Sequence, residues 1–353
     1  MGDPTRPEIQ PSLSIDRDPV PSPDPEQSAA APTSAEAPAR TGAQAGAIEK
    51  RQDGVYTLHE DVDEVLLSCA VVDDQGRPVL DLTKNDFRIW EDGVPQVARS
   101  FLHQDLPVSM GVLVDNSGSM RDKRMAVTMA VMKLLRESNP KDSAFIVNFS
   151  DRAYLDQGFT SDLEALNRGL SRFDTKGTTA LYDAVAASAE ELSKNAKQAK
   201  QVLLIITDGA DNASRLDLNQ AIRRVKNLGG PVVYAVGLLY DAEPQEVRRS
   251  HEALEILSRE TGGVSYFPRS IDEVDHIAEE VAQDIRNQYT IGYSSTKPSS
   301  LGGFRTVRVE AISPNGRRKL TVRTRNGYYA NSRQRTQAAQ SANRQPAGAQ
   351  PLP

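Results

Sequence analysis

The chain has 353 residues, of which 38% are hydrophobic, enough for one large domain with appendages or for two domains. Its formal net charge of −6 excludes an overall basic field that would attract nucleic acid or an anionic membrane. The single cysteine, Cys69, excludes a disulfide bond within the chain, and no window approaches the roughly 18 apolar residues of a membrane span.

Both ends of the chain are rich in small and polar residues. Residues 1–52 consist largely of Pro, Ala, Ser and Gln, and residues 331–353 have the same character. Such segments cannot bury enough apolar surface to offset the entropy of ordering, so we expect a disordered arm and a disordered tail. The first residues also lack the apolar core of a secretory signal peptide, so the sequence predicts no export signal.

Short alternating runs predict a small antiparallel β domain over residues 53–106. Residues 65–72 and 94–102 have the composition of strands. In residues 86–90, apolar side chains alternate with polar ones, and the sequence Glu-Asp-Gly that follows is typical of a hairpin turn.

Strands alternate with helices over residues 107–285. The runs 108–114 and 202–206 are almost continuously apolar, which is typical of strands buried on both faces of a parallel sheet. The alternation predicts an α/β domain with a doubly wound, mostly parallel sheet covered by helices on both faces. The first helix, over 123–136, has four apolar residues at helical spacing, which we expect in the core: Met125, Met129, Met132 and Leu135.

The last predicted structured segment, residues 286–330, returns to alternation. Residues 289–293, 306–310 and 319–323 are strand-like, and Asn315-Gly316 marks a tight hairpin. Because a lone hairpin is only marginally stable, we expect this extension to pack with the β domain at 53–106.

The motif Asp-x-Ser-x-Ser follows the first strand of the α/β domain. It places the Asp115 carboxylate and the Ser117 and Ser119 hydroxyls in one turn, which we expect to be exposed. Mg²⁺ prefers oxygen ligands in near-octahedral geometry and keeps several waters. A site without thiol or imidazole favours such a hard cation.

Two further segments bring oxygen ligands to the same edge of the predicted sheet. Asp208 follows the strand 202–206, and Thr179 lies in a loop that opens a helix. In an open α/β sheet, ligands gather beyond the carboxyl ends of the strands. Each motif alone is an ordinary turn or helix cap, but their joint placement predicts a metal site. Thr178 and Asp211 are predicted to support the ligands from outside, although Asp211 also suits a plain turn.

These motifs together resemble the von Willebrand factor A-type domain and its metal-ion-dependent adhesion site. The resemblance covers about residues 107–285 and implies a Rossmann-like fold. The family often has Gly-Gly-Thr where this chain has Gly-Thr-Thr, and the second threonine is the preferred ligand. The resemblance implies direct metal contacts from the two serines, with the other ligands direct or through water. The implied set is Asp115, Ser117, Ser119, Thr179 and Asp208.

The flanking segments resemble bacterial VWFA-related domain proteins of the acidobacterial type. The similarity lies in residues 79–87 with the following Glu-Asp-Gly, in 289–293, and in the closing 325–329. Many members of that family look exported. The resemblance therefore implies an extracellular or periplasmic protein.

The predicted function is a divalent-cation-dependent, adhesion-type protein-binding module. A partner protein would offer Asp or Glu to a bound Mg²⁺, or to Mn²⁺ or Ca²⁺ in its place. A second interpretation is an accessory subunit of an assembly or ATPase-driven complex. A metal-dependent hydrolase is less favoured, because the chain has no Gly-x-Ser-x-Gly elbow, no P-loop and no paired histidines. We therefore predict a protein that is not an enzyme.

Overall fold

The computed structural model describes residues 13, 48–50, 56–58, 64–172, 177–313 and 319–330. The arm predicted at 1–52 and the tail predicted at 331–353 lie outside these residues, apart from Leu13 and strand β1 (Ile48–Lys50). Strand β1 pairs antiparallel with β2 (Tyr56–Leu58). Among the described residues, no helix is both long and apolar enough to cross a membrane.

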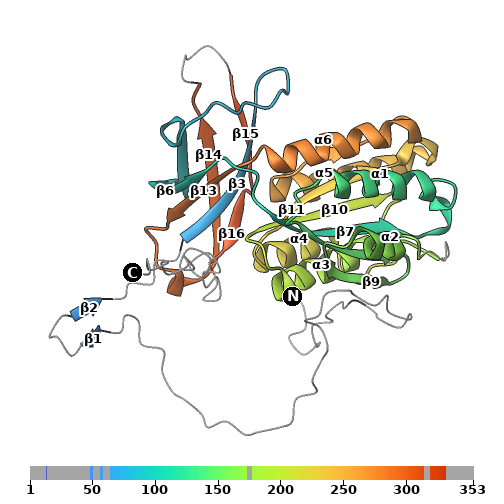
Figure 1. Ribbon diagram of the computed structural model, residues 1–353, viewed down its shortest axis with the longest axis horizontal. Coiled ribbons are helices and arrows are strands. Elements are labelled where there is room, and N and C mark those ends of the chain that lie inside the picture. Colours follow the sequence, from blue (N-terminus) through green and yellow to red (C-terminus); the bar gives the residue numbers. More distant parts are fainter. Residues whose placement is uncertain are drawn as a thin grey trace, which may run out of the picture.

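Six strands form the central sheet of an α/β unit, in the order β12-β11-β10-β7-β8-β9 (Figure 1). Neighbouring strands run parallel, except that β8 and β9 are antiparallel. The near-continuous burial of β7 and β10 agrees with their apolar sequences. The strands are β7 (Val108–Asp115), β8 (Ser143–Phe149), β9 (Ala153–Thr160), β10 (Lys200–Thr207), β11 (Val232–Gly237) and β12 (Ser265–Tyr266).

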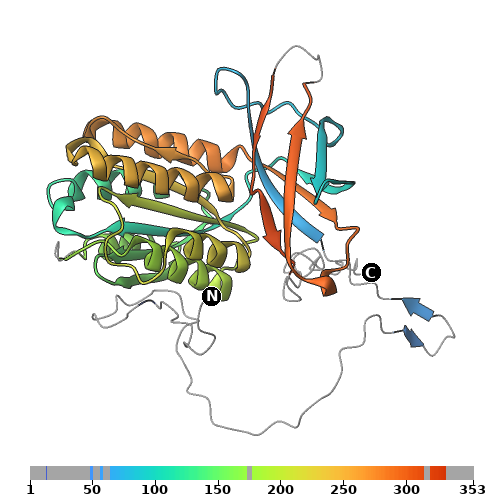
Figure 2. The ribbon, with the colours of Figure 1, turned by 180° about the vertical axis from the view of Figure 1, so that it is seen from behind.

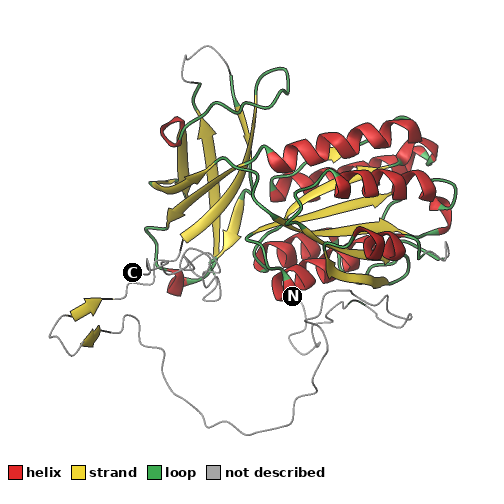
Figure 3. Ribbon diagram, in the orientation of Figure 1, coloured by secondary structure: helices red, strands yellow, loops and turns green. Residues whose placement is uncertain are grey.

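Helices cover both faces of this sheet (Figure 3). Three helices share one core with the sheet: α1 (Arg124–Arg136), α2 (Leu163–Leu170) and α6 (Val274–Arg286). Three others share the opposite core: α3 (Leu181–Asn195), α4 (Leu218–Asn227) and α5 (Pro244–Thr261). Successive residues of β7 alternate between the cores, with Val112 in the first and Leu113 in the second. Leu13 also packs against the second core. The predicted doubly wound α/β fold is confirmed.

The predicted inward face of α1 is wrong in part. Met125 and Met129 are 76% and 59% exposed, whereas Met132 is buried. The helix has apolar residues on most of its circumference, so their spacing alone does not identify the buried face. The side chains that fill the core are smaller or stiffer and pack closely against the sheet: Val127, Ala130, Val131 and Leu134.

Strands from both flanking segments form a β-sandwich beside the α/β unit (Figures 1 and 2). One antiparallel sheet has the order β15-β3-β13-β6, and the other has the order β16-β14-β4-β5. The first comprises β3 (Glu64–Val72), β6 (Ala98–Leu102), β13 (Tyr289–Ser294) and β15 (Thr321–Arg323). The second comprises β4 (Phe87–Glu91), β5 (Val94–Gln96), β14 (Phe304–Ala311) and β16 (Gly327–Tyr329).

One apolar core joins the two sheets of the sandwich and contains residues from both ends of the folded chain. The ring centroids of Phe87 and Tyr289 lie 5.2 Å apart across it, and Cys69 is buried within it. In the sequence, the α/β unit thus lies between two segments that form the two halves of the sandwich. The first half supplies β3 to β6, and the second half supplies β13 to β16. Short 3-10 helices occupy several connections: Lys84–Asp86, Gly118–Met120, Leu239–Asp241, Ile271–Glu273 and Ser299–Leu301.

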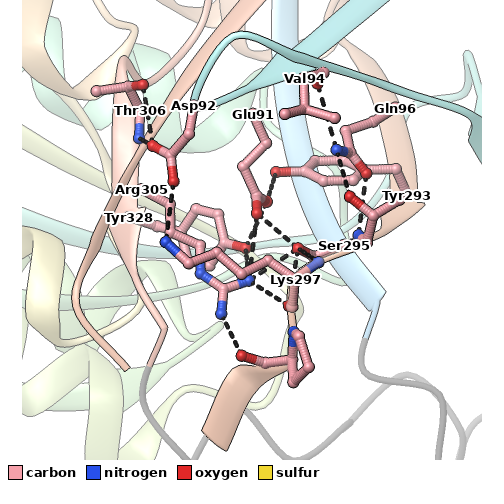
Figure 4. Close-up of polar contacts among 12 residues, drawn as sticks. Glu91, Asp92, Val94, Gln96, Tyr293, Ser295, Lys297, Arg305, Thr306 and Tyr328 are labelled. Atoms are coloured by element: carbon pink, nitrogen blue, oxygen red, sulfur yellow. Dashed lines mark hydrogen bonds and ion pairs between the residues drawn. The ribbon is translucent and has the colours of Figure 1, made fainter. Parts of the chain in front are cut away.

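A buried ion pair at one end of the sandwich links the two halves (Figure 4). Glu91 and Arg305 are 2% and 1% exposed, and Arg305 Nη1 lies 3.2 Å from Glu91 Oε1. The hydroxyls of Tyr293 and Tyr328 donate to Glu91 Oε2 at 2.7 and 2.8 Å, and Ser295 Oγ donates to Oε1. Burial and the neighbouring Glu91 raise the pKa of Tyr293, so its hydroxyl remains a donor. A charge so fully surrounded is costly to leave without its partner.

Candidate metal-binding site

Asp115 ends strand β7, and its carboxylate is fully buried. Its Oδ1 accepts from the Ser117 amide at 2.8 Å, and its Oδ2 accepts from the Thr207 hydroxyl at 2.5 Å. Burial raises the pKa of Asp115 to about 6, although these hydrogen bonds act in the opposite direction. The neighbouring strand β10 therefore fixes the orientation of this carboxylate.

The turn after β7 is less exposed than we expected. Asn116 and Ser117 are buried together with Asp115, and only Gly118 and Ser119 are exposed. The reason is that the adjacent strands, β8 and β10, extend as far as the end of β7. The Asn116 amide donates to the carbonyl oxygen of the last residue of β8, and Thr207 ends β10 beside Asp115. Ser119 is thus the predicted ligand that faces solvent.

A chain of hydrogen bonds joins the serines to Asp208. The hydroxyls of Ser117 and Ser119 lie 3.1 Å apart, and Ser119 Oγ donates to Asp208 Oδ1 at 2.8 Å. Asp208 directly follows β10, and β10 is hydrogen-bonded to β7. The structure therefore brings Asp115, Ser117, Ser119 and Asp208 together at one edge of the sheet, where the strand order reverses.

Thr179 reaches the same edge from the loop before α3. Its Oγ1 lies 3.8 Å from the position that a Cβ atom on Gly209 would take, which places it beside the residue that follows Asp208. The Thr179 amide donates to Asn212 Oδ1 at 2.8 Å. Thr179 is buried and Thr178 is exposed, so the second threonine is the one held against the site.

Asp211 supports this loop rather than the oxygen ligands themselves. Its Oδ2 accepts from the Tyr182 amide at 3.0 Å in the first turn of α3. The same oxygen accepts from the hydroxyl of Ser214. Asp211 therefore acts as a cap for α3 and ties the loop after β10 to the loop that carries Thr179.

Lys123 also reaches this edge, although its sequence position did not predict it there. Its Nζ lies 2.9 Å from Asp208 Oδ2 and 3.6 Å from Asp241 Oδ2, and it stands 5.0 Å from the centroid of the Tyr240 ring. In the sequence, only its position between the Asp-x-Ser-x-Ser turn and α1 could have indicated that Lys123 belongs to this site. A residue there belongs to neither motif, and its long side chain turns back toward the sheet edge.

A pocket of about 510 Å³ opens beside these groups and is rich in acidic residues. Ser119, Lys123 and Asp208 belong to its wall. Glu246 on α5 also lines it, and its Oε1 accepts from the Ala210 amide at 3.3 Å. The other acidic lining residues are Asp122, Asp241 and Glu243.

The assembled oxygen atoms fit a hard divalent cation. Ser117, Ser119 and Thr179 offer neutral hydroxyls, and Asp115 and Asp208 offer carboxylates. The Asp208 carboxylate already pairs with one cation, the ammonium group of Lys123. Among the described residues, no group of three or more His, Cys, Asp or Glu side chains is arranged to hold a metal. Any ion at this edge would therefore depend on the hydroxyl oxygens as well as the two carboxylates.

The fold is a doubly wound α/β domain, and carboxylate and hydroxyl oxygens gather at its topological switch point. Residues 110–210 match the family model described as von Willebrand factor type A domain. This segment of the chain is therefore a von Willebrand factor type A domain. The matched segment spans β7 through β10 and contains all five predicted ligands. A comparison with curated proteins gave no match.

Several solved structures are similar to this chain. A von Willebrand factor type A protein from Catenulispora acidiphila is 16% identical, with a TM-score of 0.46, covering 69% of this chain and 73% of that one. An aerotolerance-related membrane protein from Bacteroides fragilis NCTC 9343 is 17% identical, with a TM-score of 0.43, covering 50% and 98%. The PilB minor pilin from Streptococcus sanguinis is 12% identical, with a TM-score of 0.44, covering 67% and 83%.

Proposed function

We propose that this protein is a protein-interaction module whose binding depends on a divalent cation of the Mg²⁺ type. The observation that carries the proposal is the placement of Ser119 and Asp208, hydrogen-bonded to each other at the wall of an open pocket. Mn²⁺ or Ca²⁺ could take the place of Mg²⁺, since both also accept oxygen ligands. A partner protein would complete the coordination with an Asp or Glu side chain.

The balance of charges at the site supports a carboxylate from outside. Ser117, Ser119 and Thr179 contribute no charge, and Asp115 already accepts two hydrogen bonds from the protein. A divalent cation held largely by neutral hydroxyls would remain incompletely neutralised and would attract an anionic oxygen. The exposure of Ser119 leaves that side of the site open to a partner.

The acidic pocket makes the proposed dependence on metal strict. Asp122, Asp241, Glu243 and Glu246 line the approach to Asp208, and only Lys123 opposes them. An incoming carboxylate would be repelled by this wall unless a bound cation reversed the local field. Chelation should therefore abolish binding rather than weaken it slightly.

We propose binding without a catalytic step, because no described histidine lies beside the two serines. Three of the four histidines lie in the described residues, and each is engaged away from the serines. His103 stacks on Tyr289 in the sandwich, His251 stacks on Phe267, and His276 lies beside glutamates on α6. Ser117 and Ser119 thus have no described imidazole to activate them as nucleophiles.

The test is capture of partners on the immobilised chain from extracts of the producing cells. Wild type in Mg²⁺ is compared with wild type after chelation and with Ser119→Ala in Mg²⁺. We expect a set of proteins that is retained only by wild type with the metal present. Retention of the same proteins under all three conditions would contradict the proposal.

Replacement of Lys123 by methionine should raise the affinity for Mg²⁺ by at least about tenfold. The ammonium group competes with the metal for Asp208, and charges a few ångströms apart near a protein surface interact by a few kcal/mol. Titration calorimetry measures the change. Lys133→Met is the matched control, because Lys133 lies on α1 and pairs with Glu279 instead. An unchanged or lower affinity in Lys123→Met would show that the ammonium group does not compete.

A further inference from the structure

A second pocket, of about 130 Å³, lies between the α/β unit and the sandwich. It is at the opposite end of β10 from Asp208, because Lys200, which begins β10, lines it. The α/β unit also contributes Gly229 and Gly230, and the sandwich contributes Ser68 of β3 and Thr290 of β13. Pockets that form between structural units are frequent ligand sites.

Arg325 is the main charged group of this pocket and is only 8% exposed. Its Nη1 donates to the Gly229 carbonyl at 3.0 Å and its Nη2 donates to the Leu66 carbonyl at 2.9 Å. Its Nε is buried without a hydrogen-bond partner, and no carboxylate pairs with the guanidinium among the described residues. Burial lowers the pKa of Arg325, and the groups that oppose this shift are Tyr293, Tyr328 and Cys69, which are neutral near pH 7.

Lys200 brings a second buried cation, with only 7% of its surface exposed. Its Nζ donates to the Ile285 carbonyl. Burial lowers the pKa of Lys200 to about 8, although three carboxylates outside the pocket wall, Asp105, Asp142 and Asp284, act in the opposite direction. An anion inside the pocket would favour the charged form of Lys200 further.

The wall of this pocket contains two cations and no acidic residue. The chain as a whole carries a net charge of −6, and the pocket beside Asp208 is dominated by acidic residues, so this composition is not a general property of the surface. The hydroxyls of Ser68 and Thr290 add neutral donors. Buried charges in proteins are ordinarily paired, and this pair of cations has no partner on the pocket wall.

We propose that this pocket binds a phosphate group, with Arg325 and Lys200 as its charged ligands. A guanidinium has five N–H donors and an ammonium has three, so several remain beyond those donated to the carbonyls of Gly229, Leu66 and Ile285. A tetrahedral oxyanion with a charge near −2 matches both the two positive charges and the surplus of donors. The small volume admits free phosphate or the end of a small phosphate monoester.

The bound phosphate would also stabilise the junction between the two units. Arg325 reaches a carbonyl of the loop between α4 and β11 in the α/β unit and a carbonyl of β3 in the sandwich. Neutralising this guanidinium would strengthen a contact that spans both. A ligand that binds only the folded protein stabilises it by mass action.

Titration calorimetry of the full chain with inorganic phosphate tests the proposal, in metal-free buffer at constant ionic strength. Metal-free buffer ensures that phosphate cannot coordinate a cation at Asp208. We expect saturable binding of one phosphate by wild type and at least tenfold weaker binding by Lys200→Met and Arg325→Leu. Lys133→Met should bind phosphate like wild type, because Lys133 lies outside the pocket wall. Glycerol phosphate is compared with phosphate, to distinguish a phosphate monoester from the free ion as the ligand. Acetate is compared with phosphate, to distinguish a phosphate from a carboxylate.

The two variants keep the test independent of folding. Arg325→Leu removes a contact between the units and can lower stability by itself. Lys200→Met removes a buried cation, so it should melt at the same temperature as wild type or higher, and its loss of phosphate binding reports the site alone. The proposal is overturned if wild type shows no saturable heat, if Lys200→Met binds phosphate like wild type, or if acetate binds more tightly than phosphate.

Discussion

Replacing Glu91 with alanine should lower the free energy of unfolding by about 3–5 kcal/mol, the range observed when one partner of a buried ion pair is removed. The guanidinium of Arg305, which is almost fully buried, would lose its counter-charge. The hydroxyls of Tyr293 and Tyr328 would lose their acceptor. These groups lie on strands that follow the α/β unit, whereas Glu91 lies on β4 before it, so the loss would weaken a contact between the two halves of the sandwich.

Chemical denaturation followed by circular dichroism measures this effect. Glu310→Ala is the matched control, because Glu310 forms an exposed ion pair with Arg308 on β14, and exposed pairs contribute about 0–1 kcal/mol. Adding Arg305→Met to Glu91→Ala should recover part of the loss, since no charge then remains buried and unpaired. Equal effects of Glu91→Ala and Glu310→Ala would show that the buried pair does not hold the sandwich together.

Replacing Asp208 with asparagine should weaken Mg²⁺ binding by about 100-fold or more. Loss of a supporting residue around a metal site typically costs 10–100-fold, and the loss of a charged ligand should cost at least as much. Asparagine has the shape of aspartate and can still accept the hydrogen bond from Ser119, so the fold should be retained. The change therefore removes charge with little change in packing.

Calorimetric titration of wild type and Asp208→Asn gives the two affinities. Asp241→Asn is the control, because Asp241 lies 3.6 Å from the same lysine but is largely exposed at the edge of the pocket. It should change Mg²⁺ affinity by less than about threefold, since exposed charges are well screened. If Asp208→Asn binds Mg²⁺ as tightly as wild type, Asp208 is not a ligand.

The α/β fold was predictable because three of its strands, β7, β10 and β11, are short and largely apolar runs, with helices between them in the sequence. The residues that gather at the sheet edge were predictable for the same reason, since Asp115 ends such a strand and Asp208 directly follows one. The inward face of α1 was not predictable, because that helix is apolar on most of its circumference and packing with α6 and the sheet decides which residues are buried. The burial of the turn after β7 depends on how far β8 and β10 extend, and no local sequence pattern predicts this.

The features that the sequence did not predict depend on contacts between distant segments. Lys123 reaches Asp208 through a long side chain, and the two residues are 85 positions apart. Arg325 contacts Leu66 across 259 positions. Neither spacing corresponds to a helix, strand or turn period, so only the folded chain shows that Arg325 and Lys200 line one pocket.

The most direct test of metal-bridged recognition is the affinity of Ser119→Asp for a captured partner at saturating Mg²⁺, compared with wild type. The added carboxylate would lie beside Asp208 and should hold the metal at least as tightly, since Ser119 already contacts that residue. It would also neutralise the charge that attracts a partner carboxylate. We therefore predict partner binding at least about tenfold weaker than wild type, while metal binding is retained. Partner binding that rises together with metal affinity in this variant would contradict the account.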